Sequence, residues 1–463
     1  MIPLRRFTLS LRFAVAAVLS SVPLAADFKP EPLEVCQGQP ALGVPDWVRA
    51  ETIYEINVRQ YSEAGTFAAV EADLARIRDL GVGILWFMPV HPIGEINRKG
   101  PLGSYYSIAD YRGINPEFGT EADFVRLVKA AQAMGMRVVM DWVGNHTAWD
   151  HPWTSSHPEY YATNEAGEFV PPFGFDWTDV IQLDYENHAT WDAAIADMLY
   201  WVEVAGIDGY RCDYATGVPT AFWNEAGRRL REAKPDFFML SESEVPQHQL
   251  HAFNASYSFG MMHVINTVAA GEHGASHLDD QLARTQVRFP DDGALIYYTT
   301  NHDENSWQGT VQERLGGGVE TFAVLTYLFD GIPLIYNGQE AGMAKRLEFF
   351  ERDPIAWRPH PLAGFYRTLN QLRRDHPALH TGTGMTRIGT TANESIYALL
   401  REDATGEKVV GFLNLSDAPV TFDAAAPALA GTWQDVFGGA THTLKGSVSL
   451  ALPAWGYLVL VSE

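Results

Sequence analysis

Eight short apolar runs, separated by longer amphipathic stretches, fill the chain between residues 53 and 336. Continuous apolar strands of this kind are typical of parallel strands buried on both faces, with helices between them. A doubly wound sheet produces the same local pattern, but the number eight favours a (β/α)₈ barrel. The runs cover residues 53–58, 83–87, 137–140, 207–211, 237–240, 256–259 (the weakest pattern), 294–298 and 333–336. Helical periodicity is clearest over 68–80 and 121–134, each followed by glycine.

Two segments depart from this alternation. Residues 147–185 are rich in His, Trp, Pro and Gly, and so long a loop inside a compact domain is usually functional. From residue 382 onward short alternating strands follow one another without helices, which predicts an antiparallel β-sandwich. The predicted organisation is a signal peptide (1–26), a leader (27–47), a barrel (48–146 and 186–381), an inserted small domain (147–185) and a C-terminal β-sandwich (382–463).

The first 26 residues predict export. Three arginines precede an apolar stretch over 13–25, and small residues follow at 25–26, as in a secretory signal peptide. The apolar stretch is too short to span a bilayer. We therefore expect a secreted or periplasmic protein that is free of the membrane after cleavage, by an export route that the sequence leaves open.

Composition restricts the partners. The chain has 33 Lys+Arg against 57 Asp+Glu, a net charge of −24, so nucleic acids and anionic membranes would be repelled. Aromatic residues make up 12%, with 13 Trp, which suits stacking on sugar rings, although about half of these Trp are expected in the core. Two cysteines cannot form a disulfide framework. The sequence does not determine the oligomeric state.

Polar groups follow four of the eight predicted strands. In a barrel, chemistry takes place at the carboxyl ends of the strands, so these groups would meet at one mouth. A single carboxylate after a strand is more often a helix N-cap, but four such sites together predict an active site. The groups are Asp141, Asn145 and His146 after the third run, Arg211 and Asp213 at the fourth, Glu242 and Glu244 after the fifth, and Asn301, His302 and Asp303 after the seventh.

These motifs resemble those of the α-amylase family of glycoside hydrolases. DWVGNH, GYRCD, Ser-Glu after an apolar strand and NHD occur in the family's order, and GVGILWFMP, YSIADY and GIPLIYNGQE add further matches. The resemblance covers about residues 48 to 380. It implies a retaining (β/α)₈ glycosidase with a short domain after the third strand and a C-terminal β-domain.

The resemblance also implies the roles of the catalytic residues. Asp213 corresponds to the nucleophile, Glu242 to the general acid/base and Asp303 to the third carboxylate, which stabilises an oxocarbenium-like transition state. Spacing alone does not separate Glu242 from Glu244. Arg211, two residues before Asp213, faces the same side of the strand, and we expect its charge to keep Asp213 ionised.

Other residues are implied to bind the substrate. Tyr106 would form a stacking platform, and His146 and His302 would hydrogen-bond the hydroxyls of the scissile sugar. Arg211 is included among the substrate-binding groups, and Asp141 would hold it in place.

Two features leave the specificity and the cofactor open. Many family members carry Lys-His three and four residues after the nucleophile, where this chain has Thr216 and Gly217. We therefore expect short products, and a better fit to long maltodextrins once Lys and His are installed. Where the family binds calcium, the position of Asn145 supplies a ligand; Asp176, Asp179 and Asp184 are available as carboxylate partners, but no EF-hand-type loop is present. The chemistry itself needs no cofactor.

The expected activity is retaining hydrolysis of α-1,4-glucosidic bonds in starch or maltodextrin. An α-glucosidase, a cyclomaltodextrinase or a transglycosylase of the same family are the alternatives. A non-catalytic carbohydrate-binding homologue would be expected to lack one of the three carboxylates. A phosphate-handling barrel is disfavoured by the charge and by the absence of a Gly-rich loop after the last strands.

Overall fold

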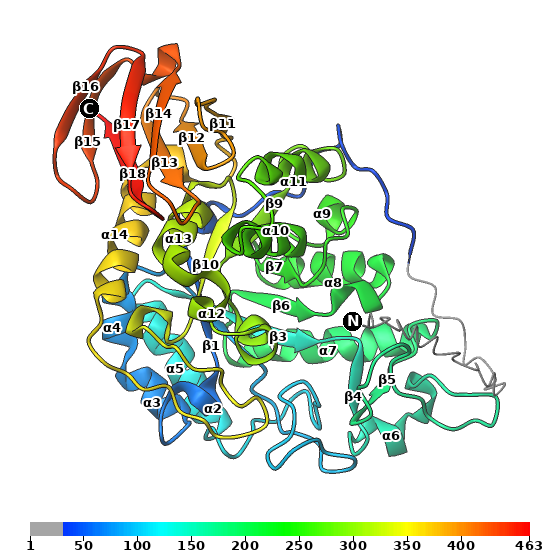
Figure 1. Cartoon of the computed structure of the whole chain (residues 1–463). Coiled ribbons are helices and arrows are strands. Elements are labelled where there is room, and N and C mark those ends of the chain that lie inside the picture. The colour runs from blue at the N-terminus through cyan, green and yellow to red at the C-terminus, as the bar shows by residue number, and fades with distance from the viewer. Residues whose placement is uncertain (1–30) are drawn as a thin grey trace, which may run out of the picture.

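A closed barrel of eight parallel strands forms the centre of the molecule, with helices around it (Figure 1). The computed structural model describes residues 31–463, so the predicted signal peptide lies outside the described residues. The predicted (β/α)₈ barrel is confirmed. Its strands are β1 (Ile53–Ile56), β2 (Ile84–Phe87), β3 (Arg137–Val143), β6 (Gly209–Asp213), β7 (Phe238–Ser241), β8 (Ala255–Ser256), β9 (Ala294–Tyr298) and β10 (Ile332–Tyr336).

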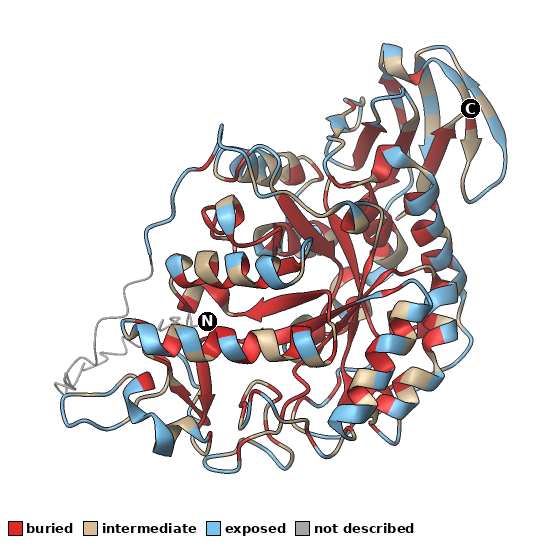
Figure 2. Cartoon of the chain, turned by 180° about the vertical axis from the view of Figure 1, so that it is seen from behind, coloured by how far each residue is buried: buried red, intermediate tan, exposed pale blue. Residues whose placement is uncertain are grey.

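Burial explains why these runs form strands. Apart from Arg137, every residue of the eight barrel strands is buried, as the red interior of Figure 2 shows, which accounts for their continuous apolar character. Strand β8 is the exception in length. It ends before the predicted 256–259 run is complete, because Phe259 already begins a helix and the Ser258 hydroxyl donates to the carbonyl of Ile296.

Most of the longer helices pack one buried face against the barrel, whereas residues 321–328 of the helix over 319–328 are all buried. The predicted helix over 68–80 is divided at Asp73, whose carboxylate accepts hydrogen bonds from Tyr61 and Arg76. Gly81 ends the second part in the left-handed region, at φ 91°. The longer helices are α3 (Phe67–Ala72), α4 (Leu74–Leu80), α5 (Glu121–Ala133), α7 (His188–Val204), α8 (Thr220–Ala233), α10 (Phe259–Ala269), α11 (His277–Gln286), α13 (Val319–Leu328) and α14 (Pro361–Asp375). Shorter ones are α1 (Asp46–Arg49), α2 (Val58–Tyr61), α6 (Trp153–Ser156), α9 (His248–His251) and α12 (Val311–Leu315).

The inserted segment after β3 is a small irregular unit. Its two ends pair as antiparallel strands, β4 (His146–Ala148) and β5 (Val180–Gln182), with His146 opposite Gln182. The segment lies at the opposite end of the molecule from the C-terminal sheets (Figure 1). His146 of β4 and Val180 of β5 both line the cavity at the mouth of the barrel.

The C-terminal region packs a six-stranded sheet against a two-stranded one, which confirms the predicted antiparallel sandwich. Phe412 and Phe422, from different sheets, meet in its core. Arg401 is buried and donates to the carbonyls of Leu328 and Phe329, which ties this region to α13. The large sheet holds β11 (Thr386–Arg387), β12 (Ile396–Glu402), β13 (Lys408–Asn414), β18 (Tyr457–Ser462), β15 (Gly431–Asp435) and β16 (Thr441–Leu444), and the small one β14 (Val420–Ala425) and β17 (Ser447–Leu452). Over residues 31–463, no helix has the length and apolar character needed to cross a membrane.

Candidate active site

Polar side chains from neighbouring strands converge at the carboxyl end of the barrel. Strands β3 and β6 are adjacent, and their register places Asp141 opposite Arg211. Asp213 is the last residue of β6, and Glu242 directly follows the next strand, β7. Asp141, Arg211, Asp213 and Glu242 therefore meet in space.

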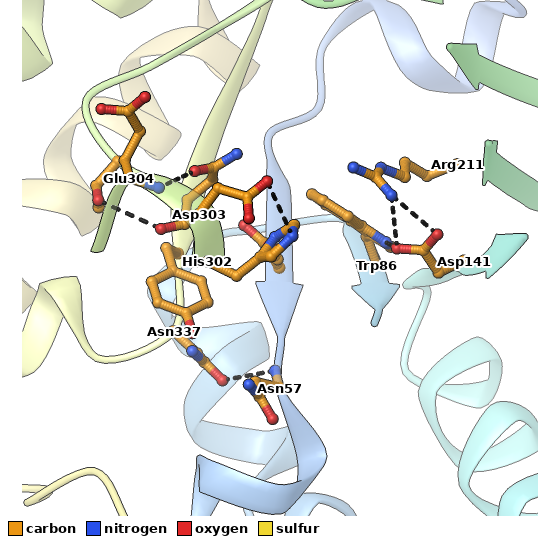
Figure 3. A network of polar contacts seen from close by, with 12 residues as sticks. Asn57, Trp86, Asp141, Arg211, His302, Asp303, Glu304 and Asn337 are labelled. Carbon is orange, nitrogen blue, oxygen red and sulfur yellow. Dashed lines mark hydrogen bonds and ion pairs between the residues drawn. The ribbon is translucent and has the colours of Figure 1, made fainter. Parts of the chain in front are cut away.

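One buried guanidinium joins three carboxylates. Arg211 Nη1 lies 3.1 Å from Asp141 Oδ1 and 3.0 Å from Asp213 Oδ1, and Nη2 lies 2.6 Å from Glu242 Oε1. Figure 3 shows the contact with Asp141, which also accepts a hydrogen bond from Trp86 Nε1. Arg211 thus positions Asp213 and Glu242 on either side of one cation.

The two glutamates after β7 point to different places. Glu242 Oε2 accepts a hydrogen bond of 2.7 Å from the backbone N–H of Tyr214. Tyr214 has φ 38° and ψ 49°, a left-handed conformation that is uncommon for a residue with a side chain. Glu244 instead accepts from the N–H of Gly260 at the start of α10. Only Glu242 of the two joins the Arg211 cluster.

Asp213 and Glu242, two of the three carboxyls beside Arg211, differ in pKa. Burial raises the pKa of Glu242 to about 8 and that of Asp213 to about 6, and the charge of Arg211 opposes both shifts. The expected effect of Arg211 on Asp213 is present, but burial outweighs it, so the pKa of Asp213 is not held at its usual value. Near neutral pH the arrangement still favours an ionised Asp213 beside a protonated Glu242.

A second network surrounds His302. Its Nδ1 lies 2.5 Å from Glu55 Oε1, and its Nε2 lies 2.9 Å from the Tyr106 hydroxyl and 3.3 Å from Asp303 Oδ2. Figure 3 shows His302 beside Asp303. Burial lowers the pKa of His302, but the charges of Asp303 and Glu55 outweigh it and raise the pKa to about 9. His302 is therefore an imidazolium that orients Tyr106 and Asp303.

Glu55 was missed by the sequence analysis. It lies in β1, fully buried, between apolar neighbours. A carboxylate inside an otherwise apolar buried strand needs a charged partner. The position of Glu55 within an apolar run was therefore the signal in the sequence that could have identified it.

The candidate active site opens into a cavity of about 590 Å³. Asp213, Glu242 and Asp303 face it together with Tyr106, His146 and His302. Tyr106 stacks on His302, with ring centroids 5.5 Å apart, while burial lowers the pKa of His146 to about 4 and so keeps its ring neutral.

Two aromatic groups at the cavity were not predicted individually. Beside Asp213, the rings of Phe175 and Trp177 stack at 4.0 Å and meet the edge of Tyr214. Next to Tyr106 lies a second group, made of Trp307, Phe349 and Phe350. Flat apolar surfaces therefore border the carboxylates in two places.

The departure at Thr216 and Gly217 has a steric cause. A Cβ atom at Gly217 would lie 2.4 Å from Asn145 Oδ1 and 2.5 Å from the ring of Tyr214. A histidine cannot be installed there without moving these neighbours. The gain expected from Lys-His at 216 and 217 stays a prediction, and the contact adds the expectation that histidine at 217 displaces Asn145 or Tyr214.

The residues considered as calcium ligands have other partners within the chain. Asp176 and Asp179 face Lys99, at 3.5 and 3.8 Å, and Asp184 accepts from the N–H of Glu186. The side-chain amide of Gln182 donates to both oxygens of Asn145, and the carbonyl oxygen also accepts the Leu183 N–H. In the described part of the chain, no three His, Cys, Asp or Glu side chains are grouped to hold a metal ion.

Comparison with known proteins identifies a common family. Residues 52–171 and 173–368 match the family described as "Alpha amylase, catalytic domain". The crystal structure of an alpha-amylase from Lactobacillus plantarum superposes with a TM-score of 0.80 at 32% identity, over 90% of this chain and 100% of that one. A maltogenic alpha-amylase, AmyB from Thermotoga neapolitana, gives a TM-score of 0.82 at 26% identity, over 90% and 99%. Alpha-amylase MalA of Haloarcula japonica is 28% identical over 81% of this chain, which spans only 57% of that relative's length.

Proposed function

The chain belongs to the α-amylase family of glycoside hydrolases, and from this premise we propose that it hydrolyses α-1,4-glucosidic bonds in starch- or maltodextrin-type glucans with retention of configuration. The observation that carries the proposal is the pair of carboxyls beside Arg211, one with a pKa near 6 and the other near 8. Retaining glycosidases require this combination of an ionised nucleophile and a protonated acid.

In the first step, Asp213 attacks the anomeric carbon while Glu242 gives its proton to the departing glycosidic oxygen. The C–O bond to the leaving sugar breaks, and a covalent bond to Asp213 Oδ forms. Glu242, now ionised, then takes a proton from water, which attacks the same carbon and releases Asp213. The N–H of Tyr214 and the guanidinium of Arg211 hold Glu242 in both states.

Three further groups act on the sugar between the two carboxyls. Asp303 carries a negative charge that stabilises the oxocarbenium-like transition state. His302 holds Asp303 and the Tyr106 hydroxyl, so Tyr106 presents its ring to the sugar. His146 faces the cavity with a neutral ring and hydrogen-bonds a sugar hydroxyl.

The leaving side favours short or aromatic leaving groups. Gly217 leaves no room for a long donor side chain, and the surfaces beside Asp213 are the rings of Phe175, Trp177 and Tyr214. Stacking binds a sugar or an aryl group without requiring a long chain. The same surface would bind an acceptor sugar, which supports transglycosylation as the second candidate activity; α-glucosidase and cyclomaltodextrinase specificity remain as alternatives within the family.

Product analysis tests the proposal. Soluble starch, maltotriose, β-cyclodextrin and p-nitrophenyl α-glucoside are incubated with the protein and with Asp213→Asn as control, and the anomer released first is identified by ¹H NMR. We expect short α-anomeric products from maltodextrin and none with Asp213→Asn. Initial release of the β-anomer would contradict retention, and the absence of turnover on all four substrates would favour a non-catalytic carbohydrate-binding protein.

We further propose that the protein acts outside the cytoplasm, on the basis of residues 1–26 alone. Mass analysis of the exported chain should show cleavage after about residue 26. Retention of a full-length chain in the cytoplasm of the native host would contradict this.

A further inference from the structure

The side-chain amide of Gln182 lies in a cage of oxygen atoms. Its Nε2 is 3.0 Å from the Asn145 carbonyl oxygen, 3.0 Å from Asn145 Oδ1 and 3.2 Å from the Leu183 carbonyl oxygen. Two of these three oxygens belong to the backbone and can only accept, and one of them, the Asn145 carbonyl, also accepts the Leu183 N–H at 3.1 Å. Whatever sits at the centre of this cage must therefore be a donor or a cation.

The surroundings of Asn145 fix which atoms point into the cage. Asn145 Nδ2 lies 3.2 Å from His146 Nδ1, so its Oδ1 turns towards Gln182. Asn145 is buried, and an unpaired oxygen there would be costly. The Gln182 amide supplies two hydrogens to the three acceptors from within the chain.

The cage lies where the inserted segment meets the barrel. Gln182 ends β5, and its register partner is His146, a residue that faces the cavity. Asn145 Oδ1 also occupies the space beside Gly217, where a Cβ atom would lie 2.4 Å from it, four residues after the proposed nucleophile. The cage thus holds two walls of the active site together.

We propose that the Gln182 side-chain amide takes the place of a divalent cation at this junction, so that the chain keeps its active site assembled without calcium there. Hard cations such as Ca²⁺ prefer six to eight oxygens and carboxylate charge. Here the cage offers three neutral oxygens, and the nearby acids Asp176, Asp179 and Asp184 are engaged elsewhere. This inference does not depend on the substrate.

The test compares thermal unfolding of the full chain in EGTA and in millimolar CaCl₂. The Tm of the wild type should be the same in both within about 1 °C, because no ligand binds the native state at this cage. Gln182→Glu replaces the donor with a carboxylate among three oxygens, so its Tm should fall in EGTA and recover by several degrees as calcium is added, in a saturable way. Gln182→Met removes the hydrogen bonds at similar volume, and its Tm should fall without recovery. Gln286→Glu, at an exposed position at the end of α11, is the matched charge control.

Two results would overturn the inference. One is a wild-type Tm that falls in EGTA, is restored by calcium and loses this response in Gln182→Met, because a cation would then occupy the cage. The other is a Gln182→Met protein with the wild-type Tm, because the amide would then hold nothing together. Both can be measured even if Gln182→Glu does not fold.

Discussion

Replacing Glu242 by Gln removes the proton that the proposed mechanism delivers to the leaving oxygen. The amide keeps the shape of the side chain, and its oxygen can still accept the Tyr214 N–H, although its NH₂ then faces the Arg211 guanidinium in place of Oε1. General acid catalysis contributes about 10²- to 10⁴-fold, so kcat on maltodextrin should fall by that factor. This corresponds to a rise of about 3–5 kcal/mol in the activation barrier. Substrates with good leaving groups, such as p-nitrophenyl glycosides, need little protonation, and their glycosylation step should slow by less than about tenfold.

The pH profile gives an independent reading of the same residue. Activity requires Asp213 to be ionised, so it should fall as the pH drops below about 6, and it requires Glu242 to be protonated, so it should fall as the pH rises above about 8. The two limbs belong to the coupled pair as a whole. In Glu242→Gln the alkaline limb should disappear, since the group that loses its proton there is gone.

Glu244→Gln is the matched control. Glu244 accepts one hydrogen bond, from the Gly260 N–H, and an amide oxygen can accept it equally well. We expect less than about a tenfold change in kcat. The reasoning is refuted if Glu244→Gln loses more activity than Glu242→Gln, or if Glu242→Gln slows maltodextrin and aryl glycosides equally.

Three further substitutions test the site. Asp213→Asn should lower kcat by about 10⁴- to 10⁶-fold, as the removal of a nucleophile does in other enzymes, without loss of thermal stability. A kcat near that of the wild type would show that Asp213 is not the nucleophile. Glu55→Gln should lower the pKa of His302 from about 9, which NMR titration would measure. It should also reduce kcat/KM about 10- to 100-fold, since one hydrogen bond between charged groups contributes about 1.5–3 kcal/mol. An unchanged His302 titration would show that Glu55 has no electrostatic effect on His302. Gly217→His should lower the free energy of unfolding, measured in urea, by about 1–3 kcal/mol through overpacking. Thr216→Lys, at the edge of the cavity, should leave this free energy unchanged. Equal stability of the two variants would contradict the steric argument.

The barrel and the sandwich could be predicted because their residues follow local rules. Buried parallel strands need continuous apolar runs, and helices end at glycines such as Gly81. Strand β8 was misplaced because its apolar pattern runs on into α10. In the C-terminal region the sequence predicts strands over 395–401, 408–414, 418–422 and 457–461, so β11, β15, β16 and β17 were missed. Strands β11, β15 and β16 are short and partly exposed, whereas β17 alternates in sequence but is largely exposed.

The sequence by itself determined which chemical groups the protein carries at the strand ends: Asp213, Glu242 and Asp303 follow their strands in the order of a known family. Only the tertiary structure decided the protonation states of these groups and the contacts that surround them. The pKa values of Asp213 and Glu242 follow from burial, which raises them, and from the charge of Arg211, which lowers them. Glu242 differs from Glu244 because only Glu242 accepts the Tyr214 N–H. The Gln182 cage and the limited space at Gly217 are formed by segments that are distant in the sequence. Burial and such contacts depend on atoms from several strands at once, and no local pattern records them.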